Sequence, residues 1–264
     1  MTKRQRRRWA WVLLLPLLIL PALVMAACGG AQPEPAPTPT LAENAARVTE
    51  LERLDKGQLK DVAYAPDGEH LAVGTTTAVY LYDADSFDLR WSVGTPEEVA
   101  VMAFSPRGRH LALGLEDGML LVLRAADGAQ RWLVESQTLA DLSLAEGELA
   151  GHAYAVRGLA YSPEGQTLAS SSLDRTVQLW RAADGAHLRI LQEEIDEFLS
   201  PVMDLGFAPD GSTLAAATGN SIRLWRLPDG QLRQILEEPG EETYIDAVAY
   251  SPSGRVLAAG LSDG

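Results

Sequence analysis

Cysteine is almost absent from this chain of 264 residues, and Cys28 is its single example. One thiol cannot form an intramolecular disulfide or a cysteine-rich zinc site, so disulfide-stapled secreted folds and zinc ribbons are excluded. The four histidines are scattered without metal-ligand spacing, and the sequence has neither a glycine-rich phosphate cradle nor a kinase signature. We therefore expect no metal and no cofactor.

Positive charge is also scarce, since 22 Lys+Arg stand against 36 Asp+Glu. Five of the basic residues lie within the first 27 positions, which contain no acidic residue; they are Lys3, Arg4, Arg6, Arg7 and Arg8. Without this segment the chain has 17 basic residues against 36 acidic ones, which gives a net charge of −19. Such a body repels a phosphate backbone, so nucleic acid is not an expected partner.

The basic head is followed by an uncharged run, residues 9–27, that ends on small residues directly before Cys28. This order is typical of an export signal. The alternative is an uncleaved membrane anchor, which the two prolines of the run disfavour. Residues 23–29 resemble the lipobox of bacterial lipoproteins, although Met25 stands where leucine is usual. The resemblance implies that Cys28 receives a lipid and becomes the mature amino terminus.

Proline alternates with small or polar residues in AQPEPAPTPT, residues 31–40. This composition favours extended geometry and cannot build a core, so it predicts a tether. We expect three parts: a signal peptide or anchor over residues 1–27, a tether over 28–46, and a folded region over 47–264.

The folded region repeats one phrase five times, an apolar-small-aromatic triplet followed by Pro-x-Gly and a Leu-Ala strand start. The prolines of the five copies are Pro66, Pro106, Pro163, Pro209 and Pro252. They are spaced 40, 57, 46 and 43 residues apart, and the long interval indicates a surface insertion at residues 135–150. Such self-similarity is the signature of a repeat architecture.

Each copy predicts short antiparallel strands joined by tight turns. After the Pro-x-Gly turn and a second strand comes a third strand that ends in an Asp-Gly type of turn, and a fourth strand follows. One sheet of four strands cannot bury both of its faces alone, whereas radial stacking buries both. We therefore predict an all-β fold, a β-propeller with about four complete blades and a partial fifth.

In these motifs the chain resembles the WD40 repeat family of β-propellers, over about residues 47–264. Copy three matches best, because Gly151-His152 opens it and Leu179-Trp180 closes its third strand. The resemblance implies a buried structural tetrad: His152 in the loop entering the blade, Ser170 in the second strand, Asp174 in the next turn and Trp180 in the third strand. The same histidine, serine and aspartate could be read as a hydrolase triad, but no Gly-x-Ser-x-Gly elbow surrounds the serine. We interpret the four residues as structural and expect no catalytic residues.

The fifth copy stops after its first two strands. Seven blades would need roughly 290 residues, so we expect a C-terminally truncated fragment. The resemblance also implies that an amino-terminal segment closes the last blade, and RVTELERL, residues 47–54, is a candidate for that strand. A five-bladed or dimer-completed ring is the alternative.

These features predict a membrane-tethered, extracytoplasmic protein that acts as a non-catalytic interaction scaffold for a protein or peptide partner. In one alternative, the missing C-terminal region completes the ring or carries an enzymatic domain. In the other, the chain is a cytoplasm-facing sensor held by an uncleaved anchor helix.

Overall fold

The protein was studied as a computed structural model, which describes residues 57–137, 151–191, 200–227, 229–237 and 243–262. All of these lie in one unit, residues 56–264. The predicted signal or anchor, the lipid-attachment residue Cys28, the tether and the candidate closing strand all lie outside the described residues, as does most of the predicted insertion. No helix long and apolar enough to cross a membrane occurs in the part of the chain that is described.

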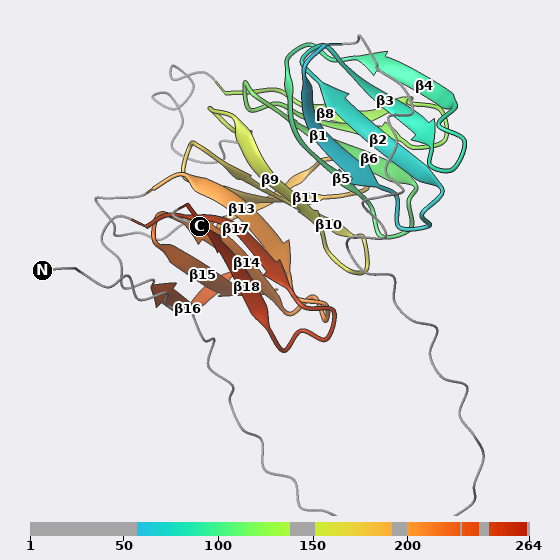
Figure 1. The fold of residues 1–264 in the computed structure, drawn as a ribbon. Helices are drawn as coiled ribbons and strands as arrows, with labels where there is room; N and C mark the ends of the chain where they lie inside the picture. The colour runs from blue at the N-terminus through green and yellow to red at the C-terminus, as the bar shows by residue number, and fades with distance from the viewer. Residues whose placement is uncertain (1–56, 138–150, 192–199, 228, 238–242, 263–264) are drawn as a thin grey trace, which may run out of the picture. The chain divides into compact units, whose positions relative to one another are not determined.

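Five antiparallel sheets make up the described structure, four with four strands and one with two (Figure 1). We call them blades one to five in chain order. Blade one contains β1 (Leu59–Tyr64), β2 (His70–Thr75), β3 (Ala78–Asp83) and β4 (Leu89–Gly94). Blade two contains β5 (Val99–Phe104), β6 (His110–Leu115), β7 (Leu120–Arg124) and β8 (Gln130–Val134).

The remaining blades repeat the same order. Blade three contains β9 (Val156–Tyr161), β10 (Thr167–Ser172), β11 (Val177–Arg181) and β12 (His187–Leu191). Blade four contains β13 (Val202–Phe207), β14 (Thr213–Thr218), β15 (Ser221–Arg226) and β16 (Gln231–Glu237). Blade five contains β17 (Ile245–Tyr250) and β18 (Leu257–Leu261). The all-β prediction and the four-stranded antiparallel sheets are thus confirmed.

The repeated Pro-x-Gly phrase forms the hairpin turn between the first and second strands. In blade one the Gly68 N–H donates to the Ala65 carbonyl at 2.9 Å. Proline presets φ at the second position of such a turn, and the glycine takes a positive φ that a side chain would oppose. The turn glycines have φ between +65° and +75°: Gly68, Gly108, Gly165, Gly211 and Gly254.

A β-bulge interrupts the pairing of the first and second strands near the start of every first strand. The register skips one residue in each blade; these are Lys60, Ala100, Arg157, Met203 and Asp246. A bulge re-aims the side chain of its extra residue. The end of each sheet at which the first strand begins, which we call the strand-entry edge, therefore presents a repeated set of re-aimed side chains.

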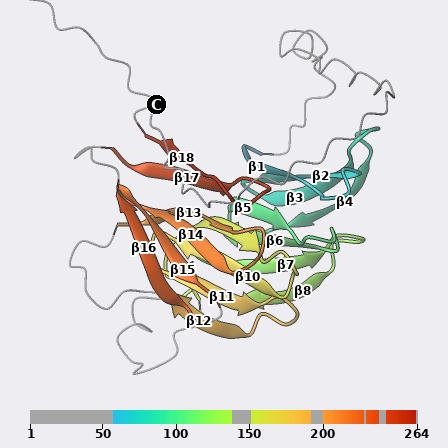
Figure 2. The same ribbon diagram turned by 90° about the horizontal axis from the view of Figure 1, so that it is seen from below.

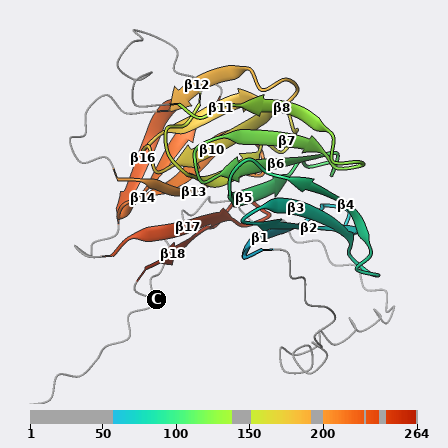
Figure 3. The ribbon, with the colours of Figure 1, turned by 90° about the horizontal axis from the view of Figure 1, so that it is seen from above.

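The core lies between consecutive blades rather than within any one of them. Four clusters of buried apolar side chains each join one blade to the next. The first strands pack in chain order, β1 on β5, β5 on β9, β9 on β13 and β13 on β17. Figures 2 and 3 show the fourth strands β4, β8, β12 and β16 on the outer side of this stack.

Candidate functional site

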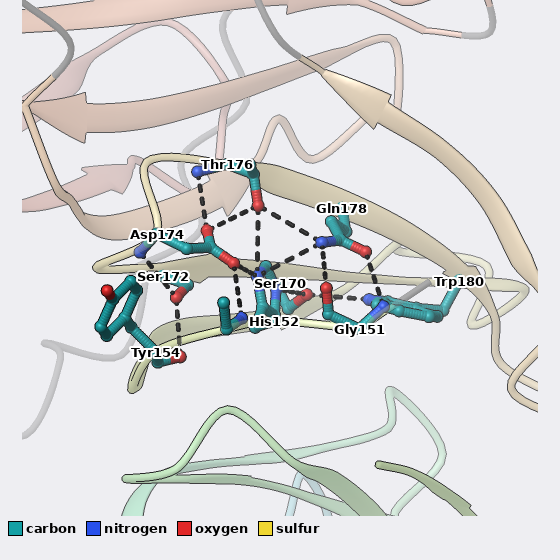
Figure 4. A network of polar contacts seen from close by, with 10 residues as sticks. Gly151, His152, Tyr154, Ser170, Ser172, Asp174, Thr176, Gln178 and Trp180 are labelled. Carbon is teal, nitrogen blue, oxygen red and sulfur yellow. Dashed lines mark hydrogen bonds and ion pairs between the residues drawn. The ribbon is translucent and has the colours of Figure 1, made fainter. Parts of the chain in front are cut away.

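The hydrogen-bond network of blade three is the densest group of buried polar side chains in the described structure. His152 precedes β9, Ser170 lies in the middle of β10, Asp174 is in the following turn, and Trp180 is on β11. The side chains of His152, Ser170 and Trp180 are completely buried. Figure 4 shows the four residues converging between the entering loop and the sheet.

The four side chains form one continuous chain of hydrogen bonds. His152 Nδ1 lies 2.8 Å from Asp174 Oδ2, and His152 Nε2 lies 2.7 Å from Ser170 Oγ. Trp180 Nε1 donates to Ser170 Oγ at 2.8 Å. Because an ionised carboxylate only accepts, Nδ1 carries the proton and donates to Asp174, and Nε2 accepts from the Ser170 hydroxyl. With this placement every donor meets an acceptor.

Other polar residues, which the sequence analysis did not single out, complete the network. Thr176 donates to Asp174 Oδ1 through its hydroxyl at 2.7 Å and its backbone N–H at 2.9 Å. The Gln178 side chain makes a reciprocal pair with the Gly151 backbone, donating to its carbonyl at 2.7 Å and accepting from its N–H at 3.3 Å. Gln178 and Trp180 lie on β11, and Thr176 directly precedes this strand, so their two-residue spacing places all three side chains on one face.

Asp174 is a buried carboxylate whose environment acts on its pKa in both directions. Burial alone raises the pKa, but the hydrogen bonds from His152 and Thr176 outweigh it. The pKa of Asp174 therefore lies below its usual value, and the carboxylate is ionised at neutral pH. The negative charge of Asp174 thus belongs to the network, in which the carboxylate joins the entering loop, through His152, to the sheet.

This geometry does not suit a hydrolase. A serine nucleophile must be reachable by substrate, whereas Ser170 lies inside a sheet at 0% exposure. Its oxygen already receives the Trp180 N–H, and its hydroxyl serves His152. The arrangement satisfies buried polar groups and leaves no room for a reacting carbonyl, which favours the structural interpretation.

The complete hydrogen-bond network of blade three does not recur in blade two, which keeps only its aspartate. In blade two, Asp117 accepts from the Met119 N–H at 3.0 Å, but the serine and tryptophan positions hold Leu113 and Leu123. Both leucines are buried in the core cluster between blades one and two. Blade two is therefore held by apolar packing where blade three uses hydrogen bonds.

Two of the four histidines, His70 and His110, are only partly exposed to solvent. His70 and His110 are the first residues of β2 and β6, are half-buried, and line one cavity. Asp67, Glu69 and His70 also bring potential ligand atoms within 4.8 Å of one another at a mostly exposed turn. One oxygen of Asp67 is already engaged by the Glu69 N–H at 2.9 Å.

The stretch from Asp83 to Asp88, which superficially resembles a calcium loop, is a turn. Asp83 Oδ1 accepts from the backbone N–H groups of Asp85 and Ser86 at 3.2 and 3.0 Å. Arg90 donates to the other oxygen at 2.7 Å. Hydrogen bonds from the Ser86 backbone and from Arg90 hold the pKa of Asp83 far below its ordinary value.

Comparison with known proteins agrees with this architecture. Residues 145–181 and 192–226 match the family model WD40, "WD domain, G-beta repeat". An uncharacterized WD repeat-containing protein of Synechocystis sp. is 29% identical over 256 residues, with 79% of this chain and 67% of the relative covered. Two stretches of the chain are thus similar to the WD40 repeat model, and the four-stranded blades agree with that similarity.

Two eukaryotic relatives are similar over smaller parts of their length. Periodic tryptophan protein 2 homolog of Dictyostelium discoideum is 26% identical over 79% of this chain and 21% of the relative. THO complex subunit 3 of Arabidopsis thaliana is 33% identical over 49% of this chain and 41% of the relative. The chain thus spans less than half of either of these proteins.

Proposed function

We propose that this chain is a WD40 repeat protein and a non-catalytic scaffold that binds a protein or peptide partner while tethered to the extracytoplasmic side of a membrane. WD40 repeat proteins are typically protein-interaction scaffolds, and function in such folds resides in surface loops. The observation that carries the proposal is the burial of the His152, Ser170 and Asp174 network. This arrangement, which resembles a catalytic triad, holds a blade together.

The strand-entry edge offers the surface that suits a partner best. Tyr154 and Tyr244 lie in the loops directly before β9 and β17, and their exposed fractions are 49% and 58%. Exposed tyrosines supply a large contact area at a low cost in side-chain entropy and are enriched at binding hot spots. Two tyrosines at corresponding loops therefore favour this edge as the contact surface.

Ion pairs between blades fix the charged residues of the same edge. Lys60 Nζ lies 2.6 Å from Glu98, and Arg157 pairs with Glu116 through two contacts of 3.2 Å. Both cations occupy bulge positions, and both acids belong to blade two. The edge is thus ordered before a partner arrives, which lowers the entropic cost of association.

The name of one relative supports an assembly role. THO complex subunit 3 is, by its name, a subunit of a complex. A scaffold function agrees with that role. The acidic body of the present chain favours a partner with a basic contact surface.

Site-specific photo-crosslinking in the native cells tests the scaffold proposal. A photoreactive residue placed at Tyr154 or at Tyr244 in the full chain should give the same discrete adduct. The control position is Leu188, which has an exposed fraction of 46% but lies on β12 at the outer side of blade three. Adducts equal at all three positions, or no adduct at either tyrosine, would argue against partner binding at this edge.

The tether rests on the sequence features around Cys28. We expect Cys28→Ala to abolish lipidation and processing and to release the protein from lipid-mediated attachment. The measurement is the mass of the mature protein together with its partition between membrane and soluble fractions. Unaltered processing and attachment would instead support an uncleaved anchor helix.

A further inference from the structure

A cavity of about 490 Å³ lies between blades one and two, away from the polar network of blade three. The starts of β2 and β6, the end of β7 and strand β4 all contribute to its wall. Its charged and titratable lining side chains are Asp67, His70, Arg90, Arg109, His110 and Arg124. Three arginines and two histidines in one cavity are unusual in a chain with so few cations.

The same position between blades three and four holds a smaller cavity of about 310 Å³ with a different lining. Repeat alignment places Leu188 where Arg90 stands, and Thr167 where His70 stands. After the turn glycine, Ser212 and Thr213 replace Arg109 and His110. The cavity is therefore a property of the repeat. Arg189 also lines the second cavity, but the combination of three arginines and two histidines belongs to the cavity between blades one and two.

Two of the three lining arginines are neutralised by aspartates. Arg90 pairs with Asp83 at 2.7 Å, and Arg124 donates to Asp127 through Nε at 2.7 Å. Among the described residues, no hydrogen bond or ion pair engages the Arg109 guanidinium or the His110 ring. One cation and one imidazole thus face the cavity without a partner.

The surroundings of His110 are electropositive. Burial lowers the pKa of His110, and the positive charges of Arg131 and Arg109 lower it further. Arg131, on β8, is likewise without an ion pair among the described residues. Asp67, an acidic residue of the lining, has its Oδ2 3.7 Å from His70 Nδ1, so its negative charge acts mainly on that histidine.

We infer that the cavity between blades one and two binds the phosphate group of a small ligand, with Arg109, His110 and His70 as its donors. A phosphate offers several oxygens to donors that approach from different blades, whereas a carboxylate is satisfied by one arginine. The acidic body opposes a polyanion, so a free phosphate or a small phosphate ester fits better than nucleic acid. Leu81, Ala125 and Ala126 give the cavity an apolar wall for the organic part of an ester.

Titration of the full chain in neutral detergent micelles with inorganic phosphate tests this inference. The ring resonances of isotopically labelled histidines are followed at fixed pH, with EDTA present and with chloride balancing the ionic strength. We expect saturable shifts for His110 and His70 and none for the completely buried His152. A linear drift that chloride reproduces would overturn the inference.

Two arginine variants allow a matched comparison of phosphate affinity. Arg109→Ser installs the residue that blade four has at this position, and we expect phosphate affinity to fall by about tenfold or more because a charge-assisted hydrogen bond is lost. Arg255→Ser makes the same charge change at the corresponding turn of blade five and should leave the affinity unchanged. Unmoved His152 resonances in both variants show that the fold is intact, and equal affinities in both would contradict the assignment.

Two further ligands distinguish what the cavity recognises. Glycerol phosphate that binds as tightly as inorganic phosphate, or more tightly, supports a phosphate-ester site that uses the apolar wall. Saturation by inorganic phosphate with exclusion of the ester supports a site for free phosphate. Acetate binding with the affinity of phosphate would overturn the phosphate assignment. Because neither partner binding nor the tether enters the argument, failure of this test leaves the scaffold proposal standing.

Discussion

At the residue scale, the described structure contains half-buried aspartates whose environments shift their pKa values in opposite directions. Asp174 accepts from His152 and Thr176, which lowers its pKa in spite of burial. Asp61, in β1, accepts from the Met102 N–H of the next blade at 2.7 Å, but burial dominates and its pKa is raised. Asp204 repeats this contact to Val248 at 2.8 Å, and its pKa is raised as well. Aspartate side chains thus accept hydrogen bonds both within a blade and between neighbouring blades.

These opposite shifts predict opposite pH dependences. The lowered folded-state pKa of Asp174 stabilises the fold above the unfolded value near 3.8, and this contribution is lost as pH falls below it. The stability advantage of the parent chain over Asp174→Asn should therefore shrink on acidification. Chemical unfolding of both proteins at neutral pH and near pH 3 measures the change.

Asp61→Asn should show the reverse trend in the same measurements. The raised pKa of Asp61 means that the folded state binds its proton more tightly, so stability falls as pH rises above about 3.8. Relative to Asp61→Asn, the parent chain should gain stability as pH falls. Parallel trends for the two aspartates would contradict the roles assigned to them.

The sequence predicted part of the blade three network. The resemblance to the WD40 family placed His152, Ser170, Asp174 and Trp180, and the structure brings all four together. Thr176 and Gln178 went unnoticed because a polar residue in a strand does not show whether it faces solvent or a buried carboxylate. That distinction depends on the packing of the entering loop.

At the element scale, the strands were predictable because their turns and alternation are local. The contacts that join blades were not, because each involves residues one repeat apart. Trp91 on β4 donates its indole N–H to the Ala125 carbonyl of blade two at 2.8 Å, and Trp132 on β8 donates to Ala182 of blade three at 3.0 Å. Within a single repeat, the sequence shows each tryptophan only as another apolar residue of a strand and gives no sign of its contact with the next blade.

Close approach of neighbouring blades also depends on a small residue in the second strand. A Cβ added to Gly114 in β6 would lie 2.5 Å from Val156 Cγ1 of the next blade. At the corresponding Gly260 in β18, the nearest atom is Ala247 Cβ of the same blade at 3.3 Å. Blade packing thus constrains the first glycine far more than the second.

Alanine substitutions at these two positions should therefore differ in their effect on stability. We expect Gly114→Ala to lower the free energy of unfolding by about 1–3 kcal/mol, because overpacking displaces a β-branched side chain. Gly260→Ala should change it by no more than about 0.5 kcal/mol. Thermal and chemical unfolding of the two variants make the comparison, and equal losses would argue against close packing of blades two and three.

At the scale of the whole molecule, the blades depend on one another because no sheet buries both of its faces alone. Each core cluster is shared by two consecutive blades. Damage inside one blade should therefore lower the stability of the stack rather than of that blade alone. Charge has a separate role, since the acidic composition affects partner choice and solubility but not the fold.

The central claim is that the hydrogen-bond network of blade three holds the fold together. Ser170 and Ser171 are neighbours in β10 and are both completely buried. Ser170 joins two hydrogen bonds, whereas the Ser171 hydroxyl has no hydrogen-bond partner among the described residues. The two serines thus form a matched pair that differs in its hydrogen bonds.

The most direct measurement is the free energy of unfolding of Ser170→Ala and Ser171→Ala, followed by tryptophan fluorescence. Trp91, Trp132, Trp180 and Trp225 place a reporter in each of blades one to four. Ser170→Ala should lower the free energy by about 1–3 kcal/mol in a single transition, because buried Trp180 and His152 lose their shared partner. Ser171→Ala should change it by less than about 0.5 kcal/mol. Equal effects of the two substitutions, or an unchanged stability of Ser170→Ala, would contradict the structural role of the network.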